Sequence, residues 1–172
     1  MAAESSTVIT QVSLARLRRA RMLRRVGLGM LFAFLGLGAL NVFGVRSAQV
    51  SVTGGGYELT VTYAAMSRPG LATPWSVEVR RAGGFDGPVT VATTAAYFEL
   101  FDENGLDPDP SAATTDGERT IWEFEPPPGE VLEISFDARI SPAVQRGGSA
   151  ETAVLVGGRP VVAVSYTTGV MP

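Results

Sequence analysis

The sequence predicts an all-β domain, an antiparallel β-sandwich, preceded by one transmembrane α-helix. Two observations lead to this fold class. Residues 26–45 are an uncharged apolar run with Asn41 as its one polar side chain. After this run, apolar and polar residues alternate with a period of two, which is typical of strands with one solvated face. No helical period follows residue 45, so a TIM barrel or a doubly wound fold is excluded.

The length of the chain limits this architecture to one soluble domain. Of the 172 residues, roughly 125 follow the apolar run, a common size for a single domain. The chain has no cysteine and no histidine. Disulfides, thiolate metal sites and the Ser-His-Asp and Cys-His arrangements are therefore excluded. We expect a protein that is not an enzyme and that carries no cofactor.

Residues 26–45 have the length and composition of a transmembrane helix. Twenty residues at about 1.5 Å of rise each span about 30 Å, the thickness of a bilayer core. A cleaved signal peptide also places charges before an apolar run, but its run usually has only about 7–15 residues. Cleavage after Ala48 would also place Arg46 where a small residue is needed. We expect an uncleaved signal-anchor in the plasma membrane.

Residues 1–25 are expected to form a basic cytoplasmic tail. They carry Glu4 and six arginines, namely Arg16, Arg18, Arg19, Arg21, Arg24 and Arg25. Arginines near a transmembrane helix tend to stay in the cytoplasm. Residues 47–172 carry seven arginines against sixteen carboxylates. We therefore expect a single-pass protein with its N-terminus inside and an extracytoplasmic domain. Nucleic-acid binding is not expected, because no aromatic residues are interleaved with the arginines.

The predicted helix carries a stripe of small residues. Gly29, Ala33 and Gly36 lie at i, i+4 and i+7, on one face, where another transmembrane helix can approach closely. The alternative is that glycine is simply frequent in membrane helices.

The predicted β-domain occupies residues 57–172, and residues 46–56 are expected as a juxtamembrane linker with a short strand at 50–52. Turn residues separate the alternating segments at spacings near ten residues. The predicted strands are 57–63, 75–80, 89–94, 120–124, 132–140, 150–156 and 160–167, the last two forming a hairpin. Residues 97–101 fit either a strand or one helical turn ended by Gly105, and the strand is adopted.

A polar loop is expected at residues 102–118, where oxygen ligands gather as they do in calcium sites. The candidate ligands are Asp102, Asn104, Asp107 and Asp109. Gly105 follows Asp102 by three positions, so the spacing of the calcium-binding loop motif is not met. The alternative is that these residues only form turns.

One hairpin resembles a known family. Trp122 and Phe124 precede Pro128-Gly129-Glu130, and a long alternating strand from Leu132 to Ile140 follows. This arrangement resembles bacterial immunoglobulin-like modules over residues 120–140. The resemblance implies an immunoglobulin-like β-sandwich that serves as a scaffold or in adhesion. Without a cysteine pair, Trp75 or Trp122 must fill the core by packing.

These observations predict a membrane-anchored interaction module. We expect contact with the lipid bilayer and with a partner in a membrane-protein complex or the cell envelope, where the chain would be an accessory or structural subunit. Self-association as a homo-oligomer remains an alternative kind of partnership. The alternative function is a calcium- or glycan-binding envelope sandwich that uses the acidic loop at residues 102–118.

Overall fold

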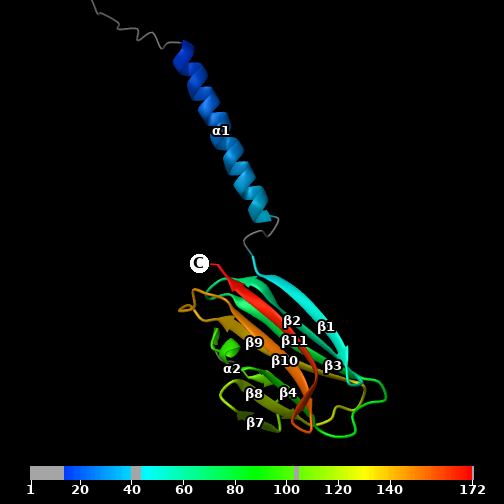
Figure 1. Cartoon of the computed structure of the whole chain (residues 1–172). Coiled ribbons are helices and arrows are strands. Elements are labelled where there is room, and N and C mark those ends of the chain that lie inside the picture. Colours follow the sequence, from blue (N-terminus) through cyan, green and yellow to red (C-terminus); the bar gives the residue numbers. More distant parts are fainter. Residues whose placement is uncertain (1–13, 40–43, 103–104, 172) are drawn as a thin grey trace, which may run out of the picture. The chain divides into compact units, whose positions relative to one another are not determined.

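The computed structural model describes residues 14–39, 44–102 and 105–171. The chain divides into two compact units, Met1–Phe43 and Gly44–Pro172. In the first unit, helix α1 runs from Leu14 to Ala39 (Figure 1). Its segment Arg18–Ala39 is long and apolar enough to cross a membrane. Residues 1–13 of the predicted tail and residues 40–43 of the predicted 26–45 span lie outside the described residues.

The second unit is predominantly β (Figure 1). Its described residues form one sheet of eleven strands that curls as a half-barrel, in the order β5-β9-β3-β2-β11-β10-β4-β8-β7, with β1 paired to β2 and β6 paired to β9. The elements are β1 (Arg46–Gly54), β2 (Tyr57–Ser67), β3 (Ala72–Arg81), β4 (Val89–Thr94), α2 (Ala95–Phe98), β5 (Phe101–Asp102), β6 (Leu106–Asp107), β7 (Ala112–Thr115), β8 (Arg119–Phe124), β9 (Val131–Ile140), β10 (Gly148–Val156) and β11 (Arg159–Val170).

Two arms of this sheet face each other across the core. Strands β2, β3 and β9 form the first arm, and β11, β10, β4 and β8 form the second. The arms join where Gly169 and Val170 of β11 pair in parallel with Met66 and Ser67 of β2. Because this pairing makes one continuous sheet, the two separate sheets of the predicted immunoglobulin-like sandwich are not shown.

The core forms where the alternating residues of both arms meet. Every second residue of β9 from Leu132 to Ile140 is buried, and the residues between them are exposed or half-buried. Trp75 of β3 and Trp122 of β8 are both buried, with ring centroids 6.4 Å apart. The prediction that tryptophans fill this core without a disulfide is therefore confirmed.

The predicted linker at residues 46–56 is corrected. Residues 46–54 form β1, which pairs with β2 from Arg46 to Gly54, and Gly55 and Gly56 make the turn between the two strands at φ values of +59° and +83°. No side chain of β1 is fully buried. Backbone hydrogen bonds to β2 hold this strand in place. Because neither of its faces is fully buried, its apolar and polar residues alternate only weakly, and the sequence does not predict a half-buried strand there.

The predicted strand at residues 97–101 is also corrected, because its first residues form the helical turn α2. Tyr97 is buried, and the centroid of the Phe98 ring lies 5.3 Å from the centroid of the Trp75 ring. Neighbouring side chains of a strand point to opposite faces, whereas a helical turn lets both rings pack into the same core. The predicted loop at 102–118 likewise contains β6 and β7, which are short and have no buried residue, so they give no strand pattern.

Candidate binding pocket and membrane anchor

The six arginines predicted to orient the chain lie in α1, and all six side chains are exposed. Successive residues of an α-helix are rotated by about 100°, so Arg16, Arg18, Arg19, Arg21, Arg24 and Arg25 surround the axis. We call this set the arginine collar. Long arginine side chains can extend toward phosphate headgroups from every side of a helix. The collar is therefore suited to a lipid surface.

The small-residue stripe of Gly29, Ala33 and Gly36 also lies in α1 and is exposed. A Cβ atom added at Gly29 or Gly36 would meet no atom within 4 Å among the described residues. Its predicted role in helix packing stays a prediction.

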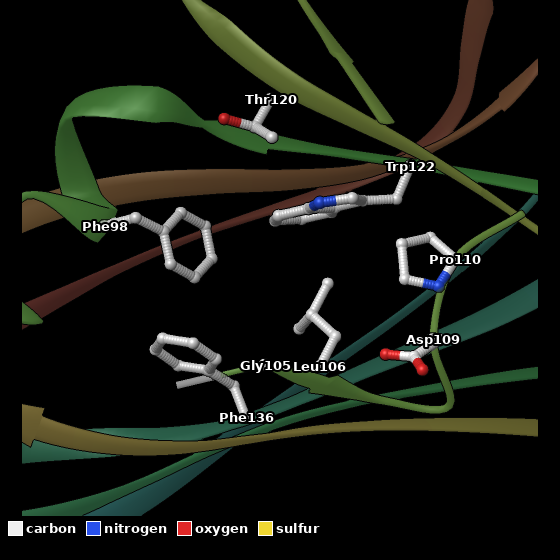
Figure 2. Close-up of a pocket in the computed structure, with 8 residues that line it drawn as sticks. All are labelled: Phe98, Gly105, Leu106, Asp109, Pro110, Thr120, Trp122 and Phe136. Carbon is white, nitrogen blue, oxygen red and sulfur yellow. The ribbon is translucent and has the colours of Figure 1, made fainter. Parts of the chain in front are cut away.

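A pocket of about 580 Å³ opens between β8 and β9 (Figure 2). This volume lies within the range of roughly 300–1,000 Å³ that is usual for small-molecule sites. Both arms and the helical turn α2 contribute to the pocket. Its lining residues are Phe98, Gly105, Leu106, Asp109, Pro110, Thr120, Trp122 and Phe136.

Three aromatic rings shape this pocket. The Phe98 ring stands edge-on to the Trp122 ring at 5.2 Å and 89°, and to the Phe136 ring at 5.5 Å and 85°. Figure 2 shows Trp122 and Phe136 on opposite sides, with Leu106 reaching between them. Trp122 and Phe136 are each 8% exposed and Phe98 is half-buried. Their rings therefore belong to the core and also line the pocket.

The segment from Gly105 to Ser111 crosses between the two arms beside this pocket. On one side, Leu106 of β6 pairs with Phe136 of β9. On the other side, the Ser111 N–H donates to the Glu123 carbonyl oxygen of β8 at 2.8 Å. These two attachments hold Asp109 and Pro110 at the pocket (Figure 2).

Among the described residues that line the pocket, Asp109 is the one that carries a charge. Its side chain is exposed, and it forms no ion pair with any residue of the described ranges. The Thr120 hydroxyl and the Trp122 indole are the other polar side-chain groups of the lining. The described part of the lining therefore combines aromatic walls with the negative charge of Asp109, which has no ion-pair partner there.

Three of the four predicted calcium ligands, Asp102, Asp107 and Asp109, lie in the described residues and do not form a metal-binding group there. Asp102 lies opposite Arg139 in the β5–β9 pair, and the Asp107 carbonyl oxygen accepts from the Ser135 hydroxyl at 3.4 Å. Asp109 is at the pocket, whereas Asn104 lies outside the described residues. Within residues 14–39, 44–102 and 105–171, no three acidic side chains form a group that could hold a metal ion.

Asp116, in the same acidic segment, forms a turn. Its carboxylate accepts from the Arg119 N–H at 2.7 Å and from the Glu118 N–H at 2.9 Å. These two backbone hydrogen bonds lower the pKa of Asp116. The turn-forming interpretation therefore holds for this residue.

A second hollow, of about 370 Å³, is lined by residues near the turns at 81–90 and 154–157. Its charges are already paired, because Arg81 contacts Asp86 at 2.7 Å and lies 5.5 Å from the Tyr57 ring centroid. The pocket at Trp122 is therefore the stronger candidate for a binding site.

The sequence did not reveal the pocket. The sequence predicts Trp122 in the core, and it predicts Asp109 as either a metal ligand or a turn-forming residue. Nothing in the alternation shows that Phe98 and Phe136, which are 38 positions apart in the sequence, line one hollow with Trp122. The aromatic composition of 97–101 and 122–124 was the available signal.

The chain is thus a predominantly β protein with one N-terminal helix that is long and apolar enough to cross a membrane. No protein-family model matches it, and comparison with curated proteins finds no match.

Proposed function

We propose that this chain is a single-pass membrane protein whose β-domain lies outside the cytoplasm and acts by binding. Its place would be that of an accessory or structural partner in a membrane-protein complex or the cell envelope. The observation that carries the proposal is α1, in which the arginine collar directly precedes an exposed apolar segment ending at Ala39. In water this apolar surface is unfavourable, whereas in lipid it is not.

The charge distribution supports the orientation. The collar favours the cytoplasmic side, and sixteen carboxylates against seven arginines follow from residue 47 onward. The pocket supports the binding role, because a hollow with apolar walls and a few polar groups is the usual form of a ligand site.

The strand order supports a relation to the immunoglobulin fold. In that fold, strands A, B and E are neighbours in one sheet, and strands C, F and G are neighbours in the other. Here β2-β3-β9 follow one another in the first arm, and β4-β10-β11 follow one another in the second. We propose that the half-barrel is an immunoglobulin-like sandwich whose sheets are joined at the β2–β11 pairing.

The anchor is tested by fractionating cells that produce the full chain with a C-terminal tag. We expect the tag in the membrane pellet after alkaline carbonate extraction, at the size of the full chain, and open to protease added from outside. A matched control carries two arginines in place of Leu31 and Leu35 in the middle of α1, which makes insertion unfavourable. A soluble polypeptide beginning near Gln49 would contradict the proposal.

The partner is tested by photo-crosslinking in native membranes. A crosslinking amino acid is placed at Asp109, beside the pocket, and at Glu58, on an outward position of β2. We expect a discrete adduct, with another protein or a second copy, from at least one position. Exclusively monomeric protein from both positions, together with a monomer in mild detergent, would count against the binding role.

A further inference from the structure

The geometry points to an organic cation, an alkylammonium group, as the ligand of the pocket between β8 and β9. This inference rests on the proposed binding role of the β-domain and specifies its ligand. Three features of the pocket carry it: the arrangement of the rings, the Asp109 carboxylate and the absence of basic residues from the described part of its lining.

The rings provide the apolar contact and part of the charge recognition. A cation is attracted to the face of an aromatic ring within about 6 Å of its centroid, and tryptophan is the strongest partner. Phe98 is perpendicular to both Trp122 and Phe136, and Figure 2 shows these two rings on opposite sides of the hollow. Because Leu106 already reaches between these two rings, an alkylammonium group in the hollow would lie beside the half-buried Leu106 side chain and against the Trp122 ring.

The carboxylate provides the complementary charge. Asp109 lines the pocket and has no ion-pair partner among the described residues, and none of the eight lining residues is basic. The sixteen carboxylates against seven arginines after residue 46 also favour the approach of cations over anions.

The same groups disfavour the other ligand classes. Calcium takes about six to eight oxygen ligands, whereas the described residues of the lining offer one carboxylate and one hydroxyl side chain. An anion would be repelled by Asp109. A neutral sugar would stack on Trp122, but its several hydroxyls would find few side-chain partners on these walls.

The test compares choline with 3,3-dimethylbutanol, which has the same shape but no charge. The full chain is held in nanodiscs of phosphatidylglycerol, a lipid without an ammonium group, and binding is measured by calorimetry and by the pocket resonances in NMR spectra. A cation–π contact and an ion pair together predict at least about tenfold tighter binding of choline.

The variant Asp109→Asn removes the charge and keeps the shape of an exposed side chain. We expect it to weaken choline binding by roughly three- to tenfold and to leave dimethylbutanol binding unchanged. The matched control is Asp107→Asn, on the same segment but outside the lining, which should bind choline like the unmodified chain. Unchanged near-UV circular dichroism shows that both variants are folded.

Equal binding of choline and dimethylbutanol would overturn the inference, and so would no binding of choline at concentrations up to roughly 20 mM. Displacement of choline by calcium or by neutral oligosaccharides at the same site would overturn it in favour of those classes. Tighter binding of a trimethyllysine peptide than of choline would support a protein side chain as the source of the alkylammonium group. If every ammonium ligand fails while the crosslinks still capture a partner, the proposed function stands and the ligand class does not.

Discussion

At the scale of single residues, a row of buried polar groups connects the two arms. The Trp75 indole N–H of β3 donates to the Tyr166 hydroxyl of β11 at 2.9 Å. That hydroxyl also lies 3.0 Å from the Thr152 hydroxyl, which in turn lies 3.0 Å from the Thr93 hydroxyl. Buried polar groups stabilise a fold only when each has a partner, so Tyr166 is central to this network.

The substitution Tyr166→Phe should therefore lower the free energy of unfolding by about 1–3 kcal/mol, because it leaves the buried Trp75 N–H without an acceptor. The measurement is urea denaturation of the full chain in nanodiscs, followed by near-UV circular dichroism. The control is Tyr63→Phe: the Tyr63 ring lies 4.9 Å from the Tyr166 ring, but its half-buried hydroxyl has no hydrogen bond among the described residues. If both variants lose the same free energy of unfolding, the hydrogen-bond network at Tyr166 does not stabilise the fold.

The same tyrosines predict a loss of stability in alkali. Burial raises the pKa of Tyr166 to about 12 and raises the pKa of Tyr97 as well. A pKa that is higher in the folded than in the unfolded chain gives stability that is complete below about pH 10 and is lost as pH rises toward 12.

We expect the free energy of unfolding to fall over this range by up to about 1.4 kcal/mol per pH unit for each of the two groups. The chain has no lysine, so few other groups titrate there. Denaturation curves at pH 9, 10 and 11 check the expectation. The double variant with Phe at positions 97 and 166 should show a nearly flat profile, and an equally steep decline in that variant would refute the assignment.

At the scale of elements, β1 is part of the folded domain. Its residues pair with β2 from Arg46 to Gly54, and a Cβ atom at Gly54 would lie 2.9 Å from the Val161 carbonyl oxygen of β11. We therefore expect the backbone hydrogen bonds between β1 and β2 to contribute to the free energy of unfolding of the β-domain.

Two versions of the β-domain without α1 test this role, one beginning at Gly44 and one at Tyr57. The shorter version should be less stable by at least about 2 kcal/mol, since it loses several ladder hydrogen bonds worth about 0.5–1.5 kcal/mol each. Their thermal and urea unfolding curves give the difference. Identical curves would mean that residues 46–54 act as a linker after all.

A second sensitive contact lies at Gly147, just before β10. A Cβ atom at Gly147 would overlap the Thr168 carbonyl oxygen of β11, whereas one at Gly87 would meet nothing within 4 Å among the described residues. The substitution Gly147→Ala should therefore cost about 1–3 kcal/mol of stability through overpacking. The control Gly87→Ala should cost little, and matching unfolding curves for the two variants would contradict this account.

These elements also show how far the sequence predicts the structure. Strand β9 and the β10–β11 hairpin follow from alternation and from the Gly157-Gly158 turn, because β9 and β11 bury alternate residues. Strand β1 and the helical turn α2 do not, since β1 has no fully buried face and α2 depends on the ring packing of Tyr97 and Phe98. The pocket depends on side chains from distant segments, which local patterns cannot bring together.

At the scale of the whole molecule, charge is divided sharply along the chain. The arginine collar lies at one end of the apolar segment of α1, and the acidic β-domain follows in the sequence. Basic residues beside a transmembrane helix determine which side stays in the cytoplasm.

Replacing the six collar arginines by glutamine and inserting four arginines after Val45 should therefore invert a substantial fraction of the molecules. Protease added from outside would then no longer degrade the β-domain in that fraction. The control carries only the insertion, with the collar intact, and should be inverted less. Full accessibility in the combined variant would show that the collar does not set the orientation.

The ends of the β-domain meet at one residue. Arg46 of β1 and Gly169 of β11 are both register partners of Met66, so the polypeptide enters and leaves the sheet within about two strand spacings, roughly 10 Å. Tension between these two points would act first on the end of β2 and on the end of β11, which β10 also holds through the Gly148–Thr168 pair.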